Sequence, residues 1–152
     1  MTGSDGTDRT PVEAVVDAVS AWPGVSLGPH EFRGREFLLG DYEFGHVHHG
    51  WQSLHVNYPR RLREHLIETD RTAAHPHFPD TGWTSFDLRR HEDVPDALWL
   101  LRVSYLYRAL TRRRKPAGRA VVDAVDVAAE LDDLDASEAV REVFADVRGA
   151  RA

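Results

Sequence analysis

Histidine is the residue type in this sequence that points most directly to chemistry. Nine of the 152 residues are histidines, and six of them form two groups: His46, His48, His49 and His55, then His75 and His77. A neutral imidazole binds divalent metal ions through a ring nitrogen. It also exchanges a proton near neutral pH, because its unperturbed pKa is about 6.5. The two groups therefore predict either a metal site or acid–base catalysis.

The first group can be placed on a β-hairpin. Residues 44–48 and 53–57 flank the turn signal Gly50-Trp51, and pairing them places His46 opposite His55, His48 opposite Ser53 and Phe44 opposite Asn57. Because side chains two apart share a face, one face carries three histidines: His46, His48 and His55. The other face carries three apolar residues: Val47, Leu54 and Val56. A slip of one residue would mix the two faces, so the apolar set supports this register.

The candidate site residues come from this face and from the loop and strand that follow it. We expect four catalytic residues: His46, His48, His55 and His75. We expect four substrate-binding residues: Trp51, Asp80, Trp83 and Ser85. The sequence requires no cofactor, but a divalent metal ion, if one binds, is expected on His46, His48 and His55. Carboxylates available to assist are Asp41, Glu43, Asp80 and Asp87. The alternative is a solvated sheet face, or histidines satisfied by hydrogen bonds; His49 and His77 are expected in solvent.

Composition excludes several other classes of site. The sequence has no cysteine, which rules out disulfides, zinc–thiolate sites, iron–sulfur clusters and a cysteine nucleophile. Ser85 lies outside any G-x-S-x-G turn, and no phosphate-binding glycine motif is present. No apolar run approaches the roughly 18–20 residues of a membrane helix, and the polar residues 1–9 lack the order of a signal peptide. We therefore expect a cytoplasmic protein that binds no membrane.

Charge is unevenly distributed along the chain. The formal net charge is −6, and residues 118–152 contribute 4 basic and 9 acidic side chains. An acidic protein is poorly suited to the phosphate backbone of DNA or RNA. We therefore expect a small-molecule ligand and no nucleic acid, although Arg112–Lys115 and Arg89-Arg90 are basic. The acidic segment leaves open a homo-oligomer, or another protein partner, that uses residues 118–152.

The elements that must position the histidines follow an α+β pattern. Helices are predicted at residues 11–21, 60–68 and 94–110, and a helical hairpin or one broken helix at residues 119–147. Strands are predicted as short runs divided by turn signals, at residues 31–32, 35–39, 42–48, 53–58 and 83–88. Residues 70–82, which contain two prolines, are predicted as a loop.

These elements predict a two-layer fold. We expect an antiparallel sheet of about five strands, a β-meander plus one, covered on one face by helices and followed by a C-terminal helical appendage. The chain then divides into a disordered tail at residues 1–9, an α+β domain at 10–112 and an acidic helical extension at 113–152.

The sequence also resembles the luciferase-domain family. The resemblance rests on four segments: Trp22–Phe32 (WPGVSLGPHEF), Gly45–Gly50 (GHVHHG), His77–Leu88 (HFPDTGWTSFDL) and Glu92–Leu110 (EDVPDALWLLRVSYLYRAL). It extends over about residues 14–110, and PDTGW with the later SF and LLRVSY is its most specific part. The residues that match the family's pattern are Gly45, His46, His48, His75, Asp80, Gly82, Trp83, Ser85 and Phe86. Pro76-His77 departs from the paired histidines expected there.

The resemblance implies a class of ligand. The family includes the luciferase of bioluminescent fungi, which oxidises a hydroxylated pyrone–phenol with molecular oxygen, together with many prokaryotic proteins. It implies at most that this chain binds an electron-rich small molecule. The first functional hypothesis is an oxygenase-like or other small-molecule enzyme, in which a histidine takes a proton from a phenol or enol. The resemblance does not imply light emission, since one fold supports many functions. The alternative is a non-catalytic ligand- or protein-binding module whose function the acidic C-terminal helices carry.

Overall fold

The chain begins with a helix, continues with the strands of one sheet, which a second helix interrupts, and ends with a series of helices. The structure, a computed structural model, describes residues 9–30 and 34–149, and the predicted strand at Glu31-Phe32 and the predicted tail, apart from Arg9, lie outside these residues. Its strands are β1 (Val25–His30), β2 (Gly34–Leu39), β3 (Tyr42–His48), β4 (Ser53–Asn57), β5 (Ala73–Ala74) and β6 (Trp83–Asp87). Its helices are α1 (Pro11–Ser20), α2 (Arg60–Glu68), η2 (His91–Asp93), α3 (Val94–Thr111), α4 (Pro116–Ala124), α5 (Val127–Asp133) and α6 (Glu138–Gly149).

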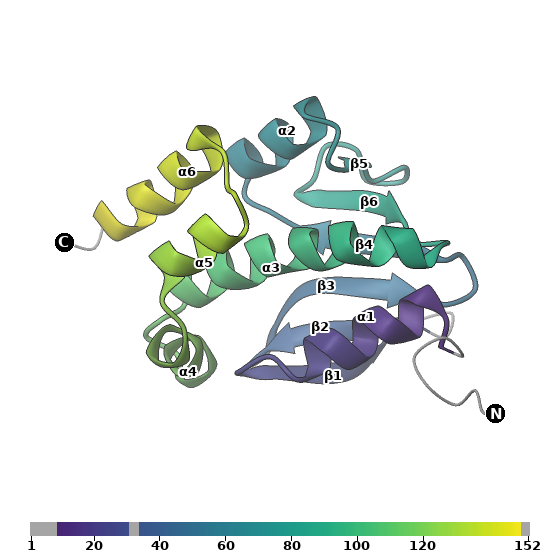
Figure 1. The fold of residues 1–152 in the computed structure, drawn as a ribbon, viewed down its shortest axis with the longest axis horizontal. Coiled ribbons are helices and arrows are strands. Elements are labelled where there is room, and N and C mark those ends of the chain that lie inside the picture. Colours follow the sequence, from purple (N-terminus) through teal and green to yellow (C-terminus); the bar gives the residue numbers. More distant parts are fainter. Residues whose placement is uncertain (1–8, 31–33, 150–152) are drawn as a thin grey trace.

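The strands form one antiparallel sheet in the order β1-β2-β3-β4-β6-β5, which confirms the predicted α+β class (Figure 1). Two strands were missed by the sequence prediction. β1 contains Gly28 and Pro29, which disfavour a strand except at the edge of a sheet, where β1 lies. β5 lies inside the predicted loop and is only two residues long, too short for a periodic pattern to reveal it.

Helices α1 and α3 lie across one face of this sheet (Figure 1). The apolar side of the predicted hairpin faces them, and Val47, Leu54 and Val56 are buried in the core, as predicted. Gly45 on β3 lies so close to α3 that a Cβ atom there would sit 2.7 Å from Cδ2 of Leu101. The opposite face of the sheet is therefore the one available to the histidines.

A β-bulge in β3 shapes that opposite face. Phe37 and Leu38 of β2 pair with Gly45 and Glu43, so Phe44 is the additional residue. The Phe44 ring lies on the core side, with its centroid 6.2 Å from that of Phe37. Because a bulge shifts the alternation of side chains by one residue, Glu43 shares a face with His46 even though the two are three residues apart in sequence.

The C-terminal segment folds into three helices beginning at Pro116, where a hairpin or one broken helix was predicted. Pro116 stands at a helix start, where its missing N–H costs nothing. Val121, Leu131 and Phe144 are buried in the same core cluster as the residues of α3. The division into a domain at 10–112 and an extension at 113–152 stays a prediction.

Helix α3 lies between the sheet and the C-terminal helices and contacts both. It is 18 residues long, and Leu101 and Tyr105 on it are fully buried. Its burial arises from packing between the sheet and the C-terminal helices, since α3 contacts β2, β3 and β4 as well as α4 and α6. Within residues 9–30 and 34–149, no helix is both long enough and apolar enough to cross a lipid bilayer.

Candidate functional site

The four predicted catalytic histidines lie together on the sheet face turned away from α1 and α3. They are buried, with exposed fractions of 8% for His46, 5% for His48, 5% for His55 and 9% for His75. The predicted pairs His46–His55 and His48–Ser53 are confirmed. The predicted pairing of Phe44 with Asn57 is wrong, because Phe44 is the additional residue of the bulge and lies on the core side. The ring centroid of His55 lies 5.1 Å from that of His46 and 4.4 Å from that of His75. Buried positions are mostly occupied by apolar residues, so four histidine rings packed this closely are an unusual feature.

A fifth histidine, His30, completes the group from β1. Its ring stacks on that of His46, with centroids 3.9 Å apart and an interplanar angle of 19°. The sequence prediction missed His30 because β1 was not recognised as a strand. The register of β1 on β2, which pairs His30 with Gly34, is the feature that brings its side chain to the histidine face.

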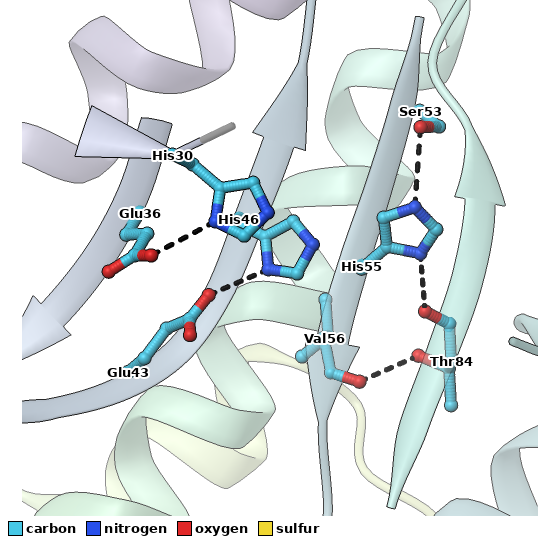
Figure 2. A network of polar contacts seen from close by, with 8 residues as sticks. All are labelled: His30, Glu36, Glu43, His46, Ser53, His55, Val56 and Thr84. Carbon is cyan, nitrogen blue, oxygen red and sulfur yellow. Dashed lines mark hydrogen bonds and ion pairs between the residues drawn. The ribbon is translucent and has the colours of Figure 1, made fainter. Parts of the chain in front are cut away.

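Two carboxylates hold the stacked pair of rings (Figure 2). Nδ1 of His30 lies 2.9 Å from Oε2 of Glu36, and Nδ1 of His46 lies 2.6 Å from Oε2 of Glu43. An ionised carboxylate only accepts hydrogen bonds, so each Nδ1 carries the proton. In the neutral form of each ring, the lone pair is then on Nε2. Glu43 was among the predicted assisting carboxylates, whereas Glu36 was not.

His55 is held by a residue of its own strand, β4, and by a residue of the neighbouring strand β6 (Figure 2). Its Nδ1 lies 3.1 Å from the carbonyl oxygen of Thr84, to which it donates, and its Nε2 lies 3.4 Å from the Ser53 hydroxyl. Burial, followed by the like charge of protonated His46 and His75, lowers the pKa of His55 to about 4. The ring is therefore neutral at neutral pH, and its Nε2 is an acceptor.

His75 belongs to the loop that leads into β6. Its Nδ1 accepts a hydrogen bond from the backbone N–H of His77 at 3.1 Å, which leaves the proton on Nε2. Burial, and next the neighbouring His77 and His46, lower the pKa of His75 below its ordinary value. The His77 side chain itself is exposed, as expected.

The histidines line two adjoining hollows of about 300 and about 250 Å³, which share four lining residues: His48, Trp51, His75 and His77. We call these two hollows together the histidine groove. Trp83 lines the first hollow and Ser85 the second, so three of the four predicted substrate-binding residues border the groove. Trp51 and Phe78, 57% and 56% exposed, stand at its edge. Aromatic walls around a few convergent polar groups are typical of small-molecule sites.

The remaining predicted residues lie elsewhere. Asp80 lines a separate cavity of about 430 Å³ with Arg60 and Arg63. Asp41 forms an ion pair with Arg112, and Asp87 is 75% exposed. None of these three carboxylates lines the histidine groove in the described part of the chain.

Two groups of potential metal ligands occur among the described residues. The first is His30, His46 and His48, and the second is His30, Glu36 and Glu43. His55 belongs to neither group, so within these residues the predicted trio of His46, His48 and His55 does not bring three ligand atoms into mutual proximity. The groove can therefore support metal binding at its β1–β3 end and proton exchange at its β4–β6 end.

Comparison with known proteins identifies one family. Residues 41–104 match the family model described as the luciferase domain. The match covers β3, β4, β6 and the first part of α3, and so includes His46, His48, His55 and His75, whereas His30 and Glu36 precede it. No curated protein and no solved structure matches the chain.

Proposed function

We propose that the protein, whose residues 41–104 match the luciferase-domain model, is an oxygenase-like enzyme that binds a small hydroxylated aromatic or enolic molecule in the histidine groove. His55 would be the proton acceptor, and His75 would donate a hydrogen bond to the bound molecule. Trp51, Trp83 and Ser85 would form the walls of the binding site.

The observation that carries this proposal is the orientation of His55. The hydrogen bond from Nδ1 to the Thr84 carbonyl fixes the tautomer, so the lone pair of Nε2 lies on the side of the Ser53 hydroxyl, where the groove is. A hydroxylated ligand can replace the Ser53 hydroxyl as the donor to this nitrogen. The planar walls supplied by Trp51 and Trp83 favour a planar ligand, because aromatic rings stack on one another.

The proposed reaction is the addition of dioxygen to the ligand. As the ligand's hydroxyl transfers its proton to Nε2 of His55, the ligand passes one electron to O₂, giving a ligand radical and superoxide. The two combine through a new C–O bond. The proton on His55 then moves to the terminal oxygen, which yields a hydroperoxide and neutral His55. The ligand is the reductant and O₂ the oxidant, so no further co-reactant is needed. Because the pKa of His55 is about 4, its imidazolium is a strong proton donor in the last step.

Oxygen consumption tests this proposal. We expect uptake of O₂ with a panel of hydroxypyrones, catechols and other phenols for the wild-type protein, and a loss of about 100-fold for the His55→Gln variant. His91→Ala, which removes an exposed histidine outside the groove, is the matched control and should keep the wild-type rate. Equal rates in wild type and His55→Gln would reject His55 as the proton acceptor.

A non-catalytic binding module is the second candidate. The exposure of Trp51 and Phe78 beside the groove supports it, since large exposed apolar side chains are typical of binding surfaces. The same panel separates the two candidates. A binding module would quench tryptophan fluorescence on adding a ligand but would consume no oxygen.

A further inference from the structure

We propose that His30, His46 and His48 together bind one divalent transition-metal ion at the end of the groove formed by β1 and β3. One ring nitrogen of each residue lies within 4.8 Å of those of the other two. The rings are close neighbours: the centroid of His48 lies 5.0 Å from that of His30 and 5.1 Å from that of His46. This inference rests on the arrangement of the ligands and does not depend on the oxidation proposed above.

The two carboxylates prepare His30 and His46 to bind a metal ion. Glu36 and Glu43 accept the hydrogen bonds of the two Nδ1 atoms, which selects the tautomer whose lone pair is on Nε2 when the rings are neutral. Metal-binding histidines commonly have a carboxylate on the second ring nitrogen, which fixes the tautomer and raises the basicity of the ligand. The two negative charges also compensate the two positive charges of the ion in a partly buried site.

The distances require a modest adjustment. Zn–N bonds of about 2.1 Å in a tetrahedral site place ligand nitrogens roughly 3.4 Å apart. The ring nitrogens lie within 4.8 Å of one another, so closing the trio shortens these separations by up to about 1.4 Å. His30 can make this movement, because its side chain is 21% exposed and it stands on the edge strand β1.

The other combinations of ligands fit less well. Both ring nitrogens of His55 already have hydrogen-bond partners, Thr84 and Ser53. Binding through His30, Glu36 and Glu43 would remove the carboxylates from the two imidazoles they orient. The trio of histidines leaves these bonds intact.

Three protein ligands leave a coordination position for water or a ligand. The three histidines line the hollow of about 300 Å³ together with Trp51, Phe78 and Trp83, so a water or ligand in that hollow would be the partner for this position. Imidazole nitrogens suit Zn²⁺, Cu²⁺, Ni²⁺ and Fe²⁺, and they select against Mg²⁺ and Ca²⁺. His30 and Glu36 lie outside the family match at residues 41–104, so the site combines the family segment with the two strands that precede it.

Titration of the tag-free apoprotein with Co²⁺ tests the inference, because tetrahedral Co²⁺ absorbs in the visible region whether or not the protein has a known substrate. We expect one Co²⁺ per chain, displaced by Zn²⁺. His30→Ala should abolish the absorption, whereas His55→Gln and the control His91→Ala should retain it. Glu43→Gln should weaken binding by about 10–100-fold, because the amide cannot supply the charge that orients His46.

Three outcomes would overturn the inference: no stoichiometric Co²⁺ binding by the wild type, unchanged binding in His30→Ala, or binding lost in His55→Gln but kept in His30→Ala. Circular dichroism of each variant checks that it is folded. A negative Co²⁺ titration would not affect the interpretation of oxygen uptake, because that experiment depends on His55. Absence of oxygen uptake would equally not affect the interpretation of the Co²⁺ titration.

Discussion

Acidification should destabilise the folded protein through His55. Burial, with the like charges of His46 and His75, lowers the pKa of His55 from 6.5 to about 4. The unfolded chain therefore takes up this proton at a higher pH than the folded protein, so the free energy of unfolding rises with pH across the window. The stability that depends on neutral His55 is fully present above pH 6.5 and is lost as the pH falls toward 4.

The loss of stability on acidification can be calculated from the lowered pKa of His55. One pKa unit corresponds to about 1.4 kcal/mol, so linkage predicts a loss of about 2.5 kcal/mol on going from about pH 7.5 to about pH 4.5. Urea denaturation at both pH values, with a chelator present, measures it. His55→Gln is the informative variant, because glutamine does not titrate but its amide can bond to both Thr84 and Ser53. Exposed His91, changed to alanine, provides the matched control.

Comparing the variants separates His55 from the other groups that titrate in this range. The ionisable groups that face His55 are His46 and His48 on β3 and His75 in the loop before β6. The wild type should lose about 2.5 kcal/mol more than His55→Gln over the same interval. An equal loss in the two proteins would show that His55 keeps its ordinary pKa and would refute the reasoning.

Three further predictions follow from packing and from the groove. Gly45→Ala should lower the free energy of unfolding by about 1–3 kcal/mol because its Cβ would collide with Leu101, while Gly50→Ala, in open space, should leave thermal unfolding unchanged. Phe144→Ala should cost about 3–5 kcal/mol in urea denaturation, and a cost near zero would show that α6 contributes nothing to the core. Trp51→Ala should weaken ligand affinity in fluorescence titration by about 2–10-fold without changing the melting temperature; unchanged affinity would remove it from the binding site.

The hairpin was predictable from sequence because its two faces differ in chemistry. Apolar residues alternate with histidines along both strands: Val47, Leu54 and Val56 with His46 and His55. Only one register keeps the three apolar residues on one face, so both the strands and their pairing could be predicted. Helix α2 was predicted with its observed bounds, since Pro59 precedes a short amphipathic run. The match of residues 41–104 to the luciferase-domain model was likewise predictable from the motifs of the sequence.

The parts of the site that escaped prediction depend on tertiary structure. His30 carries no local signal, because Pro29 beside it disfavours a strand and only pairing with β2 brings it near His46. The bulge at Phe44 is what turns Glu43 to the same face, and strict alternation would have placed it opposite. Asp80 shares a loop with His75 but faces another cavity, because the direction of a side chain in a loop follows from no periodic rule.

Mapping of ligand contacts by histidine side-chain ¹⁵N NMR tests the central claim, that the histidine groove is the functional site. On adding a hydroxylated aromatic ligand, the resonances of His55 and His75 should shift, whereas those of His65 and His91, outside the groove, should stay in place. Shifts confined to His65 and His91, or no shift with any member of the panel, would contradict the account.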